Sequence, residues 1–233
     1  MQRIEDYGLI GDGESAALVG RNGCIDWLAW PRFDSEACFA ALLGDEQHGF
    51  WRIAAEDARP ISRRYCEGSL VLEHDFECPD GARYRIIDFM EPRQDDPRLI
   101  RQVVGLKGRS PLHLLLRPRF DYGAVKPWLQ RMPSGEVRAV AGPHSVILRP
   151  PCPVDIGEGD VRAAFEVDEG ETINFVLHYE PSHIYTPEPC DPEAALQRTL
   201  AYWRGWVAKS RYQGAWGEAV NRSLITIKAL IYA

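Results

Sequence analysis

Apolar and polar positions alternate with a period of two over most of the chain, in short runs separated by turn residues. The segment 70–76 is an example, because Leu70, Leu72, His74 and Phe76 fall on one face. This period is typical of strands that bury one face. About ten such runs precede Cys190, and the sequence therefore predicts a mainly β fold, an antiparallel β-sandwich.

Turn residues predict how these strands are joined. Asn22-Gly23 lies between two apolar runs and favours a type I′ turn, and Pro79-Asp80-Gly81 divides the run after Ser69 from the next. Further pairs of runs flank Gly108 and fill the segments 136–150 and 161–180. We expect hairpins throughout, with one short helix at Glu36–Gly44.

After Cys190 the period changes to that of a helix. Asp191 and Pro192 are typical of the first residues of a helix. One apolar stripe follows, made of Leu196, Leu200, Trp203 and Val207. A break at Gln213-Gly214 precedes a second helix from Trp216 to Ala233. Its stripe contains Val220, Leu224, Ile227 and Ile231, with Ile225 and Leu230 off the stripe.

The second helix carries no stop signal before Ala233, so we expect the natural polypeptide to continue. The Pro-rich segment Thr186–Glu193 is the expected boundary between sandwich and helices. The predicted division is 1–190 for the sandwich, 191–213 for a helical linker and 214–233 for the start of a helical domain.

Composition narrows the class of protein. The 233 residues are 45% hydrophobic and 26% charged, with a net charge of −7, which argues against nucleic acid or an anionic membrane as a partner. The six cysteines form no C-x-x-C pair, so we expect reduced, packed thiols and no metal site. The opening residues contain no apolar signal core, and no run is long enough to span a membrane. The expected location is the cytoplasm, and no motif calls for a cofactor.

Glycines at Gly8–Gly13 invite comparison with a phosphate-binding loop. The segment lacks the Lys-Ser/Thr pair of such loops, and the residues after it have strand periodicity, so no helix N-terminus awaits a phosphate. We interpret the segment as a tight turn that leads into the first strand.

Two loops carry the candidate binding residues. The tetrapeptide Pro-Arg-Phe-Asp occurs at 31–34 and again at 118–121. A sugar ring is bound by an aromatic face together with charged groups that pair with its hydroxyls, so the substrate-binding candidates are Trp30, Arg32, Phe33, Asp34, Phe120, Asp121 and Tyr122. The structural alternative is a loop held by an Arg32–Asp34 interaction with Phe33 as an apolar plug, and the repeat of the tetrapeptide is as compatible with coincidence as with a shared surface.

Catalytic residues cannot be assigned from the sequence. Asp26, Asp34, Asp88, Glu91 and Asp121 are available carboxylates, but acid–base hydrolysis needs two carboxyls held across a pocket, and the sequence shows no such pair. No histidine, cysteine or serine motif of a hydrolase is present. We expect no catalytic residue within 1–233.

Several longer strings of the sequence are specific enough for comparison with known families. They are DYGLIGDGESAALVGRNGCIDWLAWPRFDSEACFAALLGD, RYCEGSLVLEHDF, IIDFMEP, LIRQVVGLKG, PRFDYG and LAYWRGWVAKSRYQGAWGEAVNRSLITIKALIY. These strings resemble the N-terminal region of glycoside hydrolase family 15, the glucoamylase- and trehalase-like enzymes. They span nearly the whole chain, in order. Cys24, Glu36 and the YCEGS string depart mildly from the family pattern.

The resemblance implies a β-sandwich of the supersandwich type, a linker helix and the first helix of an (α/α)6 barrel. It also implies an inverting α-glucosidic hydrolase whose two catalytic glutamates lie in the barrel, outside this chain. The sandwich would then shape the sugar pocket through the Trp30–Ser35 loop. A carbohydrate-binding module using Trp27, Trp30, Trp51 and Trp128, or a purely structural or homo-oligomer-forming domain, is the competing interpretation. Glucoamylase- and trehalase-like members share this region, so both substrates stay open.

Overall fold

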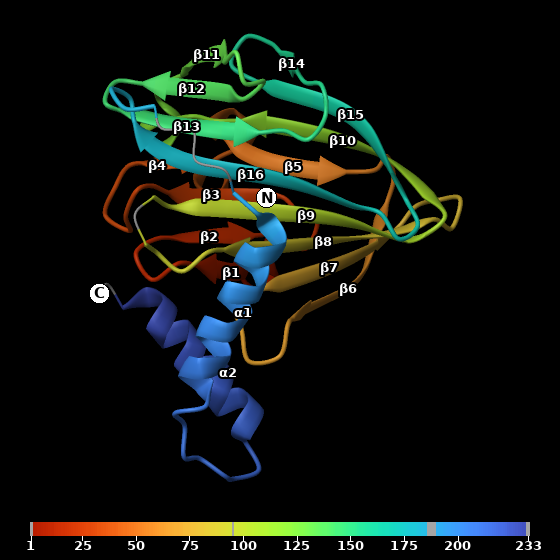
Figure 1. Cartoon of the computed structure of the whole chain (residues 1–233), viewed down its shortest axis with the longest axis vertical. Helices are drawn as coiled ribbons and strands as arrows, with labels where there is room; N and C mark the ends of the chain where they lie inside the picture. The colour runs from red at the N-terminus through yellow and green to blue at the C-terminus, as the bar shows by residue number, and fades with distance from the viewer. Residues whose placement is uncertain (1, 95, 186–189, 232–233) are drawn as a thin grey trace.

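The computed structural model describes residues 2–94, 96–185 and 190–231. Within these residues, two antiparallel eight-stranded sheets face each other, and two α-helices follow them in the chain (Figure 1). The first sheet contains β1 (Gly8–Gly11), β2 (Ala16–Val19), β3 (Ile25–Ala29), β4 (Ala37–Phe39), β5 (Phe50–Ala54), β10 (Arg109–Arg117), β14 (Asp155–Ile156) and β15 (Val161–Asp168). The second contains β6 (Arg59–Tyr65), β7 (Leu72–Glu77), β8 (Arg83–Met90), β9 (Arg98–Lys107), β11 (Trp128–Arg131), β12 (Val137–Ala141), β13 (His144–Arg149) and β16 (Thr172–Pro181).

Short 3-10 turns and two α-helices complete the described fold. The turns are η1 (Ile4–Asp6), η2 (Ala41–Leu43), η3 (Glu46–His48) and η4 (Asp121–Gly123), and the helices are α1 (Pro192–Val207) and α2 (Gly217–Leu230). The predicted mainly β sandwich followed by helices is confirmed. Residues 186–189 of the predicted boundary and the last two residues of the predicted second helix lie outside the described residues.

Three predicted hairpins are confirmed and two are wrong. The pairs β2–β3, β7–β8 and β12–β13 are antiparallel neighbours. Strands β9 and β10 on either side of Gly108 belong to different sheets, as do β15 and β16. The β9–β10 and β15–β16 connections each pass from one sheet to the other. Near these connections the backbones of β9 and β15 come so close that a Cβ on Gly105 would lie 2.0 Å from the Asp168 carbonyl oxygen, so this position requires glycine.

Three local predictions need correction. The Gly8–Gly13 segment is not only a turn, because Gly8–Gly11 is itself β1 and pairs with β2. The turn before β3 is not type I′, since Gly23 alone in it has a positive φ (74°) and Asn22 does not, which leaves a three-residue loop with a bulge. The predicted helix at Glu36–Gly44 is strand β4 followed by η2, because Ala37–Phe39 pair with β3 and are fully buried.

A buried ion pair joins the two sheets. Arg101 on β9 donates from Nε to Asp88 of β8 at 2.8 Å, and both side chains are fully buried. The same guanidinium donates to the backbone oxygens of Trp51, on β5 of the opposite sheet, and Gly23, in the turn between β2 and β3 of that sheet. Burial raises the pKa of the Asp88 carboxyl, and Arg101 opposes that shift. One arginine thus satisfies acceptors on both layers of the core.

The first part of helix α1 packs on the outer face of the second sheet, over β8, β9 and β16. Asp191 caps its N-terminus as predicted, accepting from the backbone N–H groups of Glu193 and Ala194. Ala195 packs on Phe89 and Ile100, so β8 and β9 bury apolar side chains on this face as well as in the core. Arg198 of the helix donates from Nε to Glu91 Oε1 at 2.7 Å, so an ion pair also fixes the helix to the sandwich.

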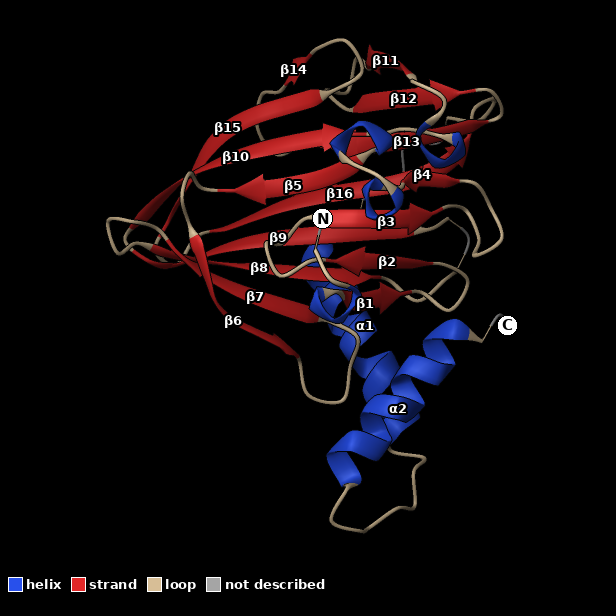
Figure 2. Ribbon diagram, turned by 180° about the vertical axis from the view of Figure 1, so that it is seen from behind, coloured by secondary structure: helices blue, strands red, loops and turns tan. Residues whose placement is uncertain are grey.

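Helix α2 packs against α1 and the sandwich with a different face from the one predicted. Ile225 and Ala229 are fully buried beside Trp203, whereas Ile227 and Ile231 of the predicted stripe are exposed. Arg222 holds the helix in place, because its guanidinium stacks on the Tyr65 ring at 4.0 Å and donates to the Ser69 oxygen at 2.8 Å. Figure 2 shows the helix pair beside the lower strands of the sandwich.

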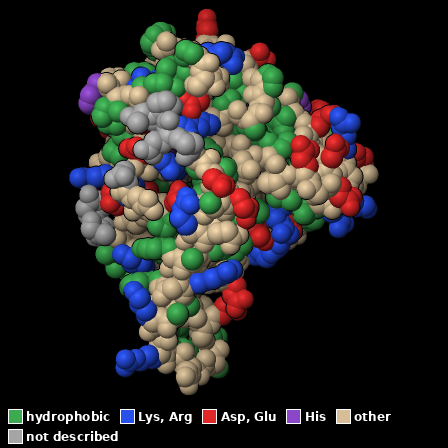
Figure 3. Space-filling model, viewed as in Figure 1, with side chains coloured by type: hydrophobic (Ala, Val, Ile, Leu, Met, Phe, Trp, Pro, Cys, Tyr) green, Lys and Arg blue, Asp and Glu red, His purple; other side chains and the backbone are tan. Residues whose placement is uncertain are grey.

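Three further observations concern the surface charge, the length of the helices and the cysteines. Figure 3 shows positive and negative side chains interspersed over one face of the molecule. Within residues 2–94, 96–185 and 190–231, no helix is both long and apolar enough to cross a membrane. The six cysteines are free thiols, and Cys24, Cys38 and Cys78 are buried.

His74 gives the sandwich a predicted sensitivity to acid. Its ring lies between the sheets beside Phe76 with neither nitrogen hydrogen-bonded to the described residues, and burial, reinforced by Arg63 and Arg101, lowers its pKa from 6.5 to about 3. Between pH 6.5 and about pH 3 the His74 ring binds a proton in the unfolded chain but not in the folded chain. The contribution of His74 to the free energy of unfolding is therefore highest above pH 6.5 and decreases as the pH falls. His74→Leu should reduce the pH dependence of the free energy of unfolding by roughly 1 kcal/mol per pH unit between pH 6.5 and 4.

Urea unfolding at pH 7 and pH 5 measures this change. His113→Leu, at an exposed position of β10, is the matched control and should leave the pH dependence as it is in the original chain. Equal pH dependence in the His74→Leu variant and the original chain would show that the buried ring does not link folding to protonation.

Candidate functional site

The Trp30–Ser35 loop follows β3 and presents only part of its predicted binding set to solvent. Trp30 is 2% exposed and packs in the sandwich core, so its ring is not available to a ligand. Arg32 and Asp34 are exposed and form a two-pronged ion pair, with Nε–Oδ1 at 2.9 Å and Nη2–Oδ2 at 2.6 Å. The hydrogen bond from Arg32 lowers the pKa of the Asp34 carboxyl. Phe33 is half-buried.

Arg93, from the connection between β8 and β9, holds this loop. It donates to Asp12 from Nε at 3.0 Å and from Nη2 at 2.7 Å, and Nη2 also donates to the Pro31 oxygen at 2.7 Å. The backbone N–H of Phe33 donates to the Glu14 oxygen at 2.8 Å. A buried arginine therefore ties the exposed Arg32–Asp34 pair to the turn between β1 and β2.

The second loop follows β10 and differs from the first despite the shared tetrapeptide. Arg119 is buried and donates to the Gly159 oxygen at 2.7 Å, whereas Arg32 is exposed. Phe120 is buried, and Asp121 and Tyr122 are exposed. The same four residues thus have two structural uses, and the repeat is no evidence for paired sites.

Topology nevertheless brings the two loops to one end of the sandwich. Strands β3 and β10 each pair antiparallel with β5, so they run in the same direction and end at the same edge. Strand β4 lies between the loops, since it pairs with β3 and its Cys38 oxygen accepts from the Arg119 N–H at 3.0 Å. The exposed candidates Arg32, Asp34, Asp121 and Tyr122 share this end.

The four tryptophans considered for a binding module do not form one exposed aromatic strip. Trp51 is fully buried like Trp30, and it lies 5.2 Å from the Arg101 guanidinium. Trp27 is half-buried on β3, with its ring centroid 6.2 Å from that of Tyr122. Trp128 on β11 is 67% exposed. The pairing of Trp27 with Tyr122 has no signal in the sequence, because a left-handed turn at Asp121–Gly123 creates it.

Four of the five carboxylates considered as acid or base accept from a donor, Asp34 among them through Arg32, and the fifth, Asp121, is exposed. Asp88 accepts from Arg101 in the core, and Glu91 accepts from Arg198. Asp26 accepts from the Tyr7 hydroxyl at 2.7 Å. In the described part of the chain, no group of three or more histidine, cysteine or acidic side chains could hold a metal ion.

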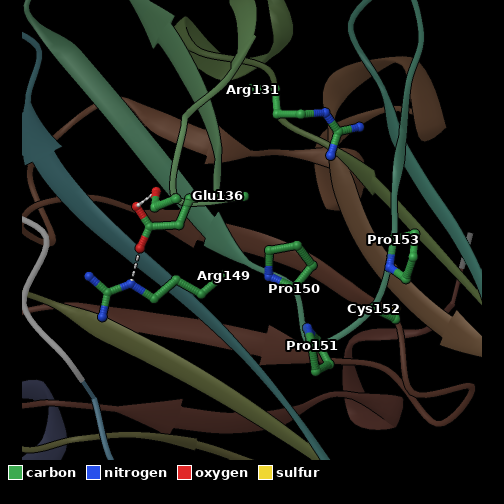
Figure 4. A pocket seen from close by; sticks show the side chains of 9 residues that line it. Arg131, Glu136, Arg149, Pro150, Pro151, Cys152 and Pro153 are labelled. Atoms are coloured by element: carbon green, nitrogen blue, oxygen red, sulfur yellow. Dashed lines mark hydrogen bonds and ion pairs between the residues drawn. The ribbon is translucent and has the colours of Figure 1, made fainter.

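A polar pocket of about 390 Å³ lies between the turn that joins β11 to β12, the end of β13 and the proline-rich segment that follows (Figure 4). Its buried carboxylate, Glu136, pairs with Arg149 and accepts from the Tyr185 hydroxyl at 2.7 Å. Burial alone would raise the pKa of Glu136, but these two donors outweigh it and hold that pKa below its usual value. Glu136 is therefore an ionised structural group, unsuited to donate a proton.

These features define a class: an antiparallel β-sandwich domain followed by packed helices, with exposed charged and aromatic candidates at one end. Residues 1–178 match the family described as "Trehalase-like, N-terminal", and the chain belongs to this family.

The chain is similar in sequence to several trehalases. A trehalase of Thermoplasma volcanium is 26% identical over 99% of this chain, and a trehalase of Mycolicibacterium smegmatis is 30% identical over 99%. The chain spans 38% of the length of each of these relatives. The solved structure of a putative kojibiose phosphorylase from human microbiome aligns with 94% of this chain and 35% of its own, with a TM-score of 0.38 and 8% identity, a similarity too low to bear on function.

Proposed function

We propose that this chain is the N-terminal, non-catalytic sandwich domain of an inverting glycoside hydrolase that cleaves trehalose. The observation that carries the proposal is the family match over residues 1–178, supported by trehalases that align with 99% of the chain. Trehalose is favoured over maltooligosaccharides as the substrate because both of these relatives are named trehalase. In the proposed parent enzyme, the proton-donating carboxyl and the carboxylate that activates water lie outside residues 1–233.

The sandwich contributes its loop end to the rim of the sugar pocket. Arg32 and Asp34 offer a guanidinium and a carboxylate on one exposed surface, a combination that donates to and accepts from sugar hydroxyls. Arg93 and Asp12 hold this loop from within, so the charged pair keeps its position without ordering at the moment of binding. Fixed contacts of this kind accelerate a reaction by orienting the substrate.

Arg32→Ala and Asp34→Ala should each lower kcat/KM for trehalose in the parent enzyme by roughly tenfold, the effect of losing one hydrogen bond to a charged group. Both variants should unfold at the same urea concentration as the original, because exposed ion pairs contribute at most about 1 kcal/mol. Arg109→Ala removes a comparable exposed pair with Glu166 at the opposite end of β10 and is the matched control. Unchanged kinetics in both loop variants would favour a purely structural domain.

A carbohydrate-binding module remains the second candidate function. Trp128 is the observation that favours it, since its ring is largely exposed on the edge strand β11. Retention of the purified chain on starch or glycogen, abolished by Trp128→Ala, is the result this candidate requires.

Packing on a catalytic barrel is our preferred role for the helical end, where Ile227, Leu230 and Ile231 are exposed. A cytoplasmic location and homo-oligomer formation remain predictions.

A further inference from the structure

Tyr122 has a backbone conformation that tyrosine rarely adopts. Asp121, Tyr122 and Gly123 have successive φ values of 50°, 54° and 103°, all in the left-handed region. Within the described ranges, the non-glycine residues with a positive φ are Asp57, Asp121 and Tyr122. Aspartate tolerates this region, but tyrosine pays a steric cost that glycine would avoid. Strain held at one residue is a reason to ask what its side chain does there.

The strained backbone places the tyrosine ring on the surface and not in the core. The ring is 45% exposed, and its centroid lies 6.2 Å from that of Trp27, with the planes tilted by 39°. Mutual backbone hydrogen bonds between Phe120 and Val125, of 2.9 and 3.0 Å, close the loop beneath it. Two aromatic rings are thereby held beside each other at the loop end of the sandwich, open to solvent on one side.

Polar groups flank this aromatic pair. Gly123 packs directly on His48, because a Cβ there would lie 2.7 Å from the nearest atom of the imidazole. The His48 ring contacts Asp45 through Nδ1 at 3.2 Å, which leaves Nε2 with no hydrogen-bond partner among the residues described. Asp121, the residue directly before Tyr122, is exposed. An imidazole nitrogen, a carboxylate and an aromatic face are the groups that a pyranose ring needs.

We propose that Trp27 and Tyr122, flanked by His48 and Asp121, bind a glucose unit of an α-glucosidic saccharide, with the C–H face of the sugar against the tyrosine ring. The choice of sugar rests on the proposed function, whereas the site itself rests on the geometry of the loop. It lies across β4 from the Arg32–Asp34 pair, so both belong to the same end of the sandwich. No part of this proposal involves the buried Trp30 or Trp51.

Fluorine NMR of the chain labelled with 5-fluorotryptophan tests the site directly. The seven tryptophan resonances are assigned with single variants such as Trp27→Phe and Trp128→Phe. Trehalose and maltoheptaose should shift the Trp27 resonance in a saturable manner, whereas glycerol at equal osmolality should not. A Trp27 resonance unmoved by either sugar, or a saturable shift of Trp128 alone, overturns the proposal.

Variants of Tyr122 separate binding from folding. Tyr122→Gly removes the ring and relieves the left-handed strain, so the chain should melt at the same or a higher temperature while its saccharide affinity falls at least tenfold. Tyr122→Phe keeps the ring and should retain the Trp27 response. A lower melting temperature for Tyr122→Gly, or an unchanged affinity, would show that the ring is structural and would overturn the proposal.

Activity of the parent enzyme distinguishes this inference from the proposed function. A parent enzyme that hydrolyses trehalose while the Trp27 resonance stays unmoved overturns the aromatic site and leaves the function standing. A parent enzyme inactive on trehalose whose Trp27 resonance responds to saccharide overturns the function and supports the site.

Discussion

Arg101→Met is expected to lower the free energy of unfolding by about 3–5 kcal/mol, the cost of leaving one charge of a buried pair uncompensated. Arg101 is the donor for Asp88 on its own sheet and for the backbone oxygens of Trp51 and Gly23 on the other. Removing it leaves a buried carboxylate and two buried carbonyls without that donor. The midpoint of urea unfolding, followed by tryptophan fluorescence, measures the loss.

The pH dependence of this loss has a defined sign. Burial already raises the pKa of Asp88 and Arg101 opposes it, so without the arginine the carboxyl is protonated in the folded state at a higher pH. A raised folded pKa contributes stability at low pH that disappears as the pH rises, so the deficit of Arg101→Met should shrink on acidification.

Two comparisons show whether the buried charge is responsible. The double variant Asp88→Leu/Arg101→Met should recover part of the loss, because no charge then remains in the core. Arg59→Met, which breaks an exposed pair with Glu77, should cost no more than about 1 kcal/mol. A double variant that is less stable than the sum of its single changes would contradict the assignment of Asp88 as the stranded group.

Arg93→Ala should have the largest effect on the candidate site, lowering kcat/KM for trehalose in the parent enzyme by roughly 10- to 100-fold. Arg93 is the contact that joins the buried Asp12 carboxylate to the Pro31 oxygen of the Trp30–Ser35 loop. Without it the loop that carries the Arg32–Asp34 pair loses its side-chain anchor and keeps the backbone bond from Phe33 to Glu14, so substrate binding must order the loop further at each turnover. Steady-state kinetics should show the loss mainly in kcat/KM.

Loss of stability must be separated from loss of positioning. Arg149→Ala removes another partly buried ion pair, with Glu136, away from the loop, so it should destabilise the chain while leaving kcat/KM for the folded enzyme unchanged. Arg93→Lys keeps the charge but not the fork that reaches Asp12 and Pro31 together, and should recover little of the activity. Equal kinetic losses in Arg93→Ala and Arg149→Ala would show that Arg93 acts through stability alone.

Local signals in the sequence predict the elements of this fold better than their pairing. Most strand runs, the position of the β2–β3 hairpin and the Asp191 cap depend on neighbouring residues and are correctly predicted, whereas the type I′ turn at Asn22-Gly23 is not. The crossings at Gly108 and Gly170 were missed because a turn residue marks where a strand ends but not which sheet the next strand joins. Ala37–Phe39 read as helix because pairing with β3, a tertiary contact, decides their conformation.

The candidate site was predictable only in part, for the same reason. Arg32 and Asp34 are exposed at a strand end, as a charged loop suggests. Trp30 directly follows β3, and the packing of the sandwich core, a tertiary feature, determines that its ring is covered. Arg93 lies 81 residues from Asp12 in the chain, and the left-handed conformation of Tyr122 has no glycine or asparagine to mark it.

Glucose release from trehalose is the most direct test of the central claim that this sandwich serves a catalytic barrel outside residues 1–233. The purified chain should release no glucose above the uncatalysed rate, whereas the proposed parent enzyme should release glucose with one unit of inverted configuration, seen by proton NMR of the first products. Hydrolysis of trehalose by residues 1–233 alone at the rate of the parent enzyme would contradict the account.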